Sequence, residues 1–450
     1  MMRRQIWRKA SVAVGAMSVT AALVAGCSAS PSTSSGSAST AASCAPSKGK
    51  VVLQYWNWVP GMDKVISLWN KSHPNIQVEM KNIANNSNQQ ITNALKAGQQ
   101  PELAQVGYDE LPNYREQNAL EDVSACTAAV AAAKDFVPWT WSQATFNGQG
   151  IYAFPQDTGP QAMFYRADLF EKYHIPVPTT WAQYAQDALT LKRDDPKLDI
   201  TFFDPSNGQA FEGLLWQADA SMYSYTNGKW QVSLDSANAK QVADYWQKLI
   251  NEKVVRTDLT NSSTAMYNAY ANGQLATMIS ASWGYSLLRD NVPSQSGDWR
   301  VAPLPSWTAG TASSGDWGGS TVAFLKGDKD LYEAVEFNLW LETNPQALAL
   351  ENSLGGLYPA STAGQSLPQL TQGVAYYGGQ KIFDVFKQAA SQINTSWTWG
   401  PTQDAADTSL QNALIASVNG NGTLSGALAQ AQTATINTMQ GQAIPVEAAK

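Results

Sequence analysis

Histidine and cysteine are scarce in this 450-residue sequence, which contains two histidines and three cysteines. His73 and His174 stand far apart, and no spacing of histidine with cysteine is typical of a metal site. The sequence also lacks a Gly-x-Ser-x-Gly turn and a glycine-rich phosphate loop. We therefore expect no metal and no cofactor, and we expect neither serine-hydrolase nor nucleotide-dependent chemistry.

Clusters of basic residues are missing as well. The formal net charge is −7, and because the first 26 residues carry four basic and no acidic side chains, the rest of the chain carries −11. An acidic chain without a basic cluster argues against nucleic acid as a partner. It also argues against electrostatic docking on anionic lipid.

The sequence has no apolar run long enough to span a membrane, which requires roughly 20 residues. Its main apolar run, residues 11–24, follows four basic residues and leads into Val-Ala-Gly-Cys at residues 24–27. This order predicts a secretory signal over residues 1–26. Residues 28–47 are almost wholly Ser, Ala, Thr, Pro and Gly, so residues 27–48 are expected to form a flexible tether.

The residues around Cys27 resemble the lipobox of bacterial lipoproteins. The resemblance implies cleavage before Cys27 and a diacylglyceryl group on its thiol, which would hold the protein on the extracellular face of the cell membrane. Contact with the membrane is then expected through this anchor only. Stable anchoring requires more than one acyl chain, and a diacylglyceryl group supplies two. The alternative is a secreted protein with a cysteine at this spacing by chance.

If Cys27 carries lipid, Cys44 and Cys126 remain as a pair. An oxidising exterior favours a disulfide between them. The alternative is two buried free thiols.

Strands and helices alternate after the tether. Periodicity predicts strands at residues 50–56, 76–80 and 102–107, with helices at 60–70 and 88–97 between them. This order implies a parallel sheet with right-handed crossovers. A second α/β series starts after residue 152, and the tail from residue 404 to 439 is mostly helical.

Several short motifs occur in a characteristic order, each weak alone: PELAQV at 101–106, YAFP at 152–155, DTG at 157–159, PTTW at 178–181, APLP at 302–305 and DWGG at 316–319. Together they resemble the extracellular solute-binding proteins of sugar ABC transporters, the group that contains maltose-binding protein. The resemblance covers the chain from about residue 50 to residue 444. The family segment has Pro-Asp where this chain has Pro101-Glu102.

The resemblance implies an α/β fold of the periplasmic-binding-protein type II class, with two α/β lobes joined by a hinge and a ligand cleft between them. The first lobe is expected to contain residues 49–157 plus 318–395, and the second residues 158–317 plus 396–450. The chain should cross between lobes near residues 155–161, 314–320 and 394–401. The implied protein is a monomer that binds a di- or oligosaccharide, delivers it to permease subunits, and is not an enzyme.

Aromatic residues are abundant, at 10% with 17 tryptophans. A sugar presents C–H faces that flat rings cover, and hydroxyls that carboxylates and amides bind. Aromatic and polar residues near strand ends and crossings are therefore the candidate ligand-binding residues: Trp56, Asn57, Trp58, Asp109, Asp157, Trp216, Trp283, Trp317, Gly318 and Trp399.

Trp283 and Trp317 are the strongest of these candidates. Trp283 matches a stacking tryptophan of the family, and the glycines after Trp317 would let the backbone approach a ligand. Trp216 lies beside two leucines on an expected helix, so core packing is an alternative role for it. Core packing is also an alternative for Trp56 and Trp58, and a helix N-cap is an alternative role for Asp109.

Other functions stay open at this point. A secreted glycoside hydrolase would also be rich in tryptophan and could use two of the carboxylates. A binding protein for a non-sugar solute such as a polyol, or an adhesive surface lipoprotein, would show the same signal and tether.

Overall fold

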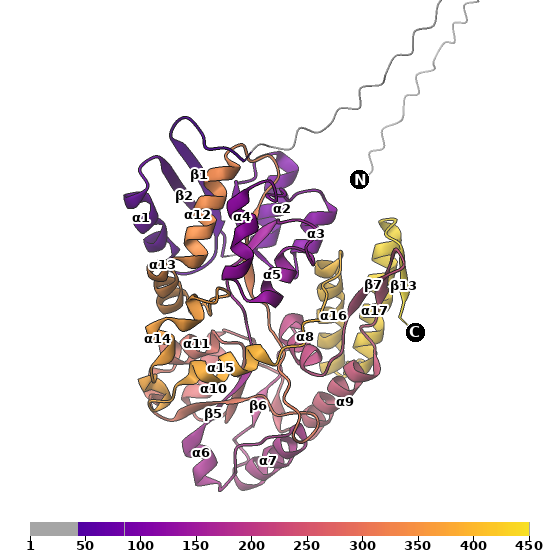
Figure 1. Ribbon diagram of the computed structural model, residues 1–450. Helices are drawn as coiled ribbons and strands as arrows, with labels where there is room; N and C mark the ends of the chain where they lie inside the picture. Colours follow the sequence, from indigo (N-terminus) through magenta and orange to yellow (C-terminus); the bar gives the residue numbers. More distant parts are fainter. Residues whose placement is uncertain (1–43, 85, 450) are drawn as a thin grey trace, which may run out of the picture. The chain divides into compact units, whose positions relative to one another are not determined.

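The computed structural model describes residues 44–84 and 86–449 (Figure 1). The expected signal, the Cys27 lipid site and the tether as far as residue 43 lie outside the described residues. Among those described, no helix is both long enough and apolar enough to cross a membrane.

The first lobe is built on a mixed five-stranded sheet with the order β2-β1-β3-β12-β4. Strand β1 runs parallel to β2 and β3, which confirms the predicted parallel arrangement. Strand β12 is antiparallel to both β3 and β4, so a segment far along the chain completes the sheet. The strands are β1 (Val51–Asn57), β2 (Ile76–Asn82), β3 (Leu103–Gly107), β4 (Ala153–Pro155) and β12 (Ser320–Phe324).

Amphipathic helices bury their apolar sides against this sheet. In α1, Met62, Val65, Ile66 and Trp69 are buried, as the helical spacing predicted. The first-lobe helices are α1 (Met62–Ser72), α2 (Ser87–Ala97), α3 (Leu111–Glu116), α4 (Thr127–Ala131), α5 (Pro138–Ala144), α12 (Leu331–Thr343) and α13 (Pro345–Leu350).

The second lobe is built around β5, which pairs antiparallel with β10 on one side and β11 on the other. A parallel pair, β6 with β9, lies beside it. Thr180 caps α7 by accepting a hydrogen bond from the Gln183 backbone N–H, as predicted. The elements are β5 (Ala162–Arg166), α6 (Ala167–Lys172), α7 (Trp181–Asp194), β6 (Thr201–Phe202), α8 (Gly208–Gln217), α9 (Ala237–Asn251), β9 (Val255–Arg256), α10 (Thr264–Ala271), β10 (Thr277–Ser280), α11 (Gly284–Asn291) and β11 (Trp299–Pro303).

Two further helices, α14 (Pro368–Thr371) and α15 (Ile382–Ser391), also belong to the second lobe. Helix α15 packs on β11 and β5, and the ring of Phe386 lies 5.8 Å from that of Phe164. The expected boundary at residue 395 assigned this helix to the first lobe, whereas its contacts join it to the second.

The third passage between the lobes therefore precedes α14. Its residues 358–360 run beside the first crossing, where the Thr158 N–H donates to the Tyr358 carbonyl and the Ala360 N–H to the Gln156 carbonyl. The segment at 394–401 instead joins α15 to α16, so the expected position of the third crossing was wrong.

The C-terminal part covers one side of the second lobe (Figure 1). Helices α16 (Gln403–Val418) and α17 (Leu424–Gly441) pack on each other, α16 also on α8 and α17 on α9. A hairpin of β7 (Tyr223–Thr226) and β8 (Lys229–Val232) turns at Asn227-Gly228, both with positive φ, and β13 (Val446–Ala448) pairs with β8.

Cys44 and Cys126 form a disulfide, which confirms the predicted pair. Cys126 is the residue immediately before α4. Three residues after Cys44, the Ser47 N–H donates to Glu333 Oε1 at 2.7 Å and its hydroxyl to Asp330 Oδ1 at 2.8 Å. The start of the described chain is thus fixed to the first lobe.

Candidate ligand-binding site

The three crossing segments lie together and are joined by backbone hydrogen bonds. The Trp317 N–H donates to the Gly159 carbonyl at 2.9 Å, and the Gln161 N–H to the Gly315 carbonyl at 3.0 Å. These segments, with the carboxyl end of β3, form the floor of the region between the lobes, where ligands of open α/β folds are expected.

Trp283 and Trp317 meet at these crossings. Their ring centroids lie 5.7 Å apart in an edge-to-face arrangement, and both side chains are half-buried. A Cβ on Gly159 would lie 2.7 Å from the Trp283 ring and 2.2 Å from the Trp317 carbonyl, so only glycine fits there. Gly318 has a φ of +74°, and a Cβ there would lie 3.5 Å from the outer edge of the Trp283 ring. The structure brings these three predicted residues together.

Asp157 is buried beside this pair. Its Oδ1 accepts hydrogen bonds from the Ser320 hydroxyl at 2.6 Å and the Ser320 N–H at 2.8 Å, which ties the first crossing to the second. Burial raises the pKa of Asp157 to about 6. The Gln105 amide donates to the Ser320 hydroxyl and accepts from the Trp58 N–H, so the network reaches the ends of β1 and β3.

Asp109, two residues after β3, links the lobes. It is buried and accepts a hydrogen bond from the side chain of Gln209 on α8 of the second lobe. Burial raises the pKa of Asp109. The residue that precedes α3 is Glu110, whose side chain makes no capping hydrogen bond, so the alternative N-cap role for Asp109 is not observed.

A cluster of buried carboxyl groups continues from Asp109. The Gln403 amide donates to Glu212 Oε1 at 3.2 Å and to Asp407 Oδ1 at 2.6 Å. Burial raises the pKa of Glu212 to about 7, and burial together with Asp109 raises the pKa of Glu110 to about 8. Carboxyl groups that titrate near neutral pH can both donate and accept hydrogen bonds, as hydroxyl ligands require.

Sequence reasoning missed Glu212, Gln209 and Asp407. Glu212 stands in the apolar run Ala-Phe-Glu-Gly-Leu-Leu-Trp, and a charged residue inside such a run was the available signal. Within residues 44–84 and 86–449, no group of three or more acidic, histidine or cysteine side chains could hold a metal ion.

The three candidates at the end of β1 have other contacts. The Lys81 ammonium lies 3.7 Å over the Trp56 ring, on the neighbouring strand β2. The Asn57 side chain donates to the Tyr55 hydroxyl at 2.6 Å and accepts from the Val59 N–H at 2.7 Å. Trp58 packs against two apolar clusters, one within the first lobe and one that also contains second-lobe residues.

Trp216 and Trp399 lie in a tryptophan cluster between the lobes. Trp216 stacks on Trp397 with centroids 4.7 Å apart and contacts Trp399 edge-on at 5.9 Å. Trp139 of α5 in the first lobe contacts Trp216 at 6.0 Å. Trp216 is 2% exposed and its indole N–H donates to the Asn394 carbonyl, which supports the alternative core role.

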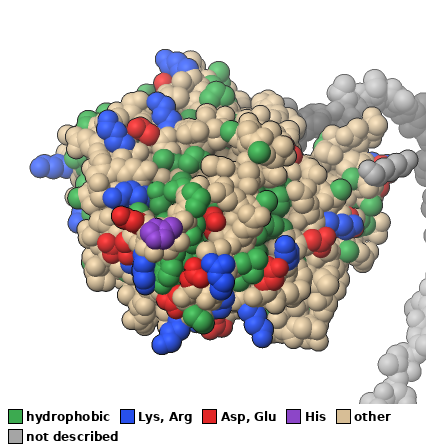
Figure 2. Space-filling model, turned by 90° about the horizontal axis from the view of Figure 1, so that it is seen from below, with side chains coloured by type: hydrophobic (Ala, Val, Ile, Leu, Met, Phe, Trp, Pro, Cys, Tyr) green, Lys and Arg blue, Asp and Glu red, His purple; other side chains and the backbone are tan. Residues whose placement is uncertain are grey.

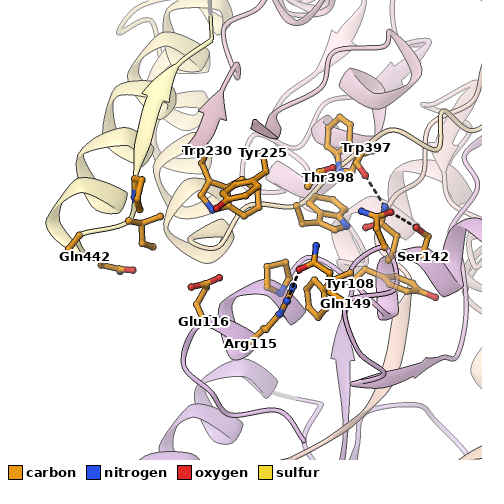
Figure 3. Close-up of a pocket in the computed structure, with 18 residues that line it drawn as sticks. Tyr108, Arg115, Glu116, Ser142, Gln149, Tyr225, Trp230, Trp397, Thr398 and Gln442 are labelled. Atoms are coloured by element: carbon orange, nitrogen blue, oxygen red, sulfur yellow. Dashed lines mark hydrogen bonds between the residues drawn. The ribbon is translucent and has the colours of Figure 1, made fainter. Parts of the chain in front are cut away.

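A pocket of about 770 Å³ opens beside this cluster (Figure 3). It lies between α3 and α5 of the first lobe and three second-lobe segments: the β7–β8 hairpin, residues 397–399 and residues 442–445. Trp399 lines it, whereas its other wall residues were not among the candidates. Aromatic residues on both sides of Asn227-Gly228 were the signal that could have found Tyr225 and Trp230. A much smaller pocket of about 40 Å³ lies beside Trp317.

Comparison with known proteins defines the class. The family model of the bacterial extracellular solute-binding proteins matches residues 55–348, and the chain belongs to this family. Solved structures of two-lobe solute-binding proteins match nearly the whole described chain, which confirms the expected fold class.

Individual proteins that are similar to this chain share a low sequence identity with it. The galacto-N-biose/lacto-N-biose I-binding protein of an ABC transporter from Bifidobacterium longum, solved with lacto-N-biose, matches with a TM-score of 0.80 and 27% identity over 89% of this chain and 100% of its own. An ABC transporter-associated binding protein from B. animalis subsp. lactis, solved with β-1,6-galactobiose, matches with a TM-score of 0.78 and 25% identity, covering 88% and 100%. The arabinooligosaccharide-binding protein of Bacillus subtilis is 22% identical over 77% of this chain and 82% of its own.

Proposed function

We propose that this protein is the substrate-binding component of an ABC sugar importer. It captures a di- or oligosaccharide between its lobes, closes about the hinge and delivers the sugar to permease subunits. The observation that carries this proposal is the pairing of Trp283 with Trp317 at the crossings, next to the buried carboxyl group of Asp157 in the first crossing. The sugar ligands named for its structural relatives support it.

The chemistry of the site suits a neutral polyhydroxylated ligand. Half-buried indole faces cover sugar C–H groups, and Asp109, Glu212 and Asp407 offer hydrogen bonds to hydroxyls in a desolvated setting. A strongly basic wall, which an anionic ligand would require, is not found around these residues in the described part of the chain. On the face drawn in Figure 2, Lys and Arg side chains are interspersed with Asp and Glu.

Calorimetry and product analysis on the same glycan panel test this function. We expect micromolar or tighter binding of at least one di- or oligosaccharide, with the glycan recovered intact. Turnover of the bound glycan would favour the second candidate, a glycoside hydrolase, for which the paired buried carboxyls are the supporting observation.

The proposal includes a lipid anchor on Cys27, which would keep the receptor near its permease while the tether lets it move. Cells grown with a clickable palmitate analogue should label the wild-type protein, and Cys27→Ala should lose the label and appear in the medium. Equal labelling of the two proteins would exclude Cys27 as the anchor. The protein is proposed to act as a monomer.

A further inference from the structure

We infer that the 770 Å³ pocket is an outer part of the sugar site, which holds the distal units of an oligosaccharide of three or more units. The inference rests on the proposed function and names the length of its ligand. The inner units would lie at Trp283 and Trp317, and the outer units between α3 and the β7–β8 hairpin.

The pocket has the size and the two-sided construction that such a ligand needs. Its volume falls in the range of about 300–1,000 Å³ that encloses small ligands. In Figure 3, Trp230 and Tyr225 lie on the hairpin side, and Arg115 and Glu116 lie across the pocket on the α3 side. Because the two walls belong to different lobes, a ligand in the pocket would contact both.

The hairpin wall is an aromatic platform held by the backbone. Tyr225 and Trp230 are directly opposite across the hairpin, with ring centroids 5.3 Å apart. The Trp230 N–H donates to the Pro445 carbonyl, and the residue pairs with Val446 of β13. Tyr225 is 61% exposed, so its ring is accessible to a ligand in the pocket.

The α3 wall supplies donors in fixed positions. The Arg115 guanidinium donates to Gln149 Oε1 at 2.7 Å and lies 4.4 Å over the Phe146 ring. A guanidinium has five N–H donors, so donors remain for sugar hydroxyls.

Tyr108 connects the pocket to the inner site. It lines the pocket, directly precedes Asp109, and packs at 6.3 Å against Trp139 of the tryptophan cluster. Its ring carbon would lie 3.0 Å from a Cβ on Gly319, at the second crossing. One side of this ring thus borders the crossings, and the same residue borders the outer pocket.

The test is calorimetry with arabino-oligosaccharides and β-1,6-galacto-oligosaccharides of two to five units. In the series whose disaccharide binds, we expect the wild type to bind the four-unit sugar at least about tenfold more tightly than the disaccharide. Trp230→Ala and Tyr225→Ala should each weaken four-unit binding about fivefold or more and change disaccharide binding less than about twofold. Trp307→Ala, a half-buried tryptophan outside both pockets, is the matched control and should change neither.

The outcomes separate the two proposals. If the disaccharide binds but longer sugars bind no better, or if the hairpin variants weaken both lengths equally, the outer site is wrong and the proposed function stands. If no sugar of either series and no glycan of the wider panel binds the wild type, the proposed function fails, and this inference with it. If Trp230→Ala unfolds at a lower temperature than the wild type, the test relies on Tyr225→Ala, at an exposed position, and on the conservative Trp230→Tyr. Trp230→Tyr should retain most of the gain in affinity with sugar length.

Discussion

At the residue scale, Trp283 and Trp317 are expected to supply much of the binding energy. Trp283→Ala and Trp317→Ala should each weaken binding of the cognate sugar at least about tenfold, or roughly 1.4 kcal/mol, because each removes a stacking face. Calorimetry measures the change, and thermal melting checks that both variants fold. Unchanged affinity in both variants would refute this site.

The buried carboxyl Glu212 should make stability depend on pH. Burial raises its pKa from the ordinary 4.5 to about 7, so the folded protein holds a proton that the unfolded chain releases at lower pH. The stability that the Glu212 carboxyl contributes is therefore fully present below about pH 4.5 and is lost as the pH rises through about 7. Asp407, Asp109 and Gln403 face it, and the two carboxyl groups among them share the effect.

Glu212→Gln should flatten this dependence. We expect the fall in the free energy of unfolding between pH 5 and pH 8 to shrink by on the order of 2 kcal/mol, because the neutral amide has no proton to lose. Denaturant titrations at the two pH values measure it. Glu336→Gln, at an exposed position on α12, is the control and should keep the wild-type slope. A wild-type slope in Glu212→Gln would show that the other carboxyls carry the effect.

The sequence alone could assign some residues to the candidate site but not others. Trp283, Trp317 and Gly318 could be grouped because each follows a predicted strand or lies in a glycine-rich crossing, and such positions converge at one edge of a sheet. Glu212 could not be recognised in the same way. Its partners Gln403 and Asp407 lie on another helix far along the chain, and only packing of α16 on α8 brings them near.

At the scale of elements, the disulfide fixes the start of the described chain to α4. Replacing Cys44 and Cys126 with serine should lower the free energy of unfolding by about 2–4 kcal/mol, since the bond closes a loop with a sequence separation of 82. Denaturation of the variant should coincide with that of the wild type under reducing conditions. No difference between oxidised and reduced wild type would show that the bond adds no stability.

Elements with strong periodicity were predictable, and those defined by distant partners were not. Strands β1, β2 and β3 and helices α1 and α2 follow from local alternation and helical spacing. Strand β13 has three residues and exists because β8 offers an open edge. The apolar face of α15 fits either lobe by composition, so its place on β11 comes from tertiary packing alone.

At the scale of the whole molecule, the lifetime of the complex with sugar depends on the contacts between the two lobes. The hydrogen bond from Gln209 to Asp109 joins α8 of the second lobe to the end of β3 in the first, and the Trp139–Trp216 contact joins the same lobes nearby. Contacts that hold the lobes together around a ligand should slow ligand release more than they affect encounter.

Gln209→Ala should therefore raise the dissociation rate of bound sugar about three- to tenfold, as expected for loss of a hydrogen bond to a charged or partly charged group. The association rate should change less than about twofold. Stopped-flow tryptophan fluorescence measures both rates, since several tryptophans lie at the lobe interface. Gln346→Ala, at an exposed position on α13, is the control. If Gln209→Ala released sugar at the control rate, closure would have to be maintained by the tryptophan cluster and the ligand itself, and Trp139→Phe would then be the variant that speeds release.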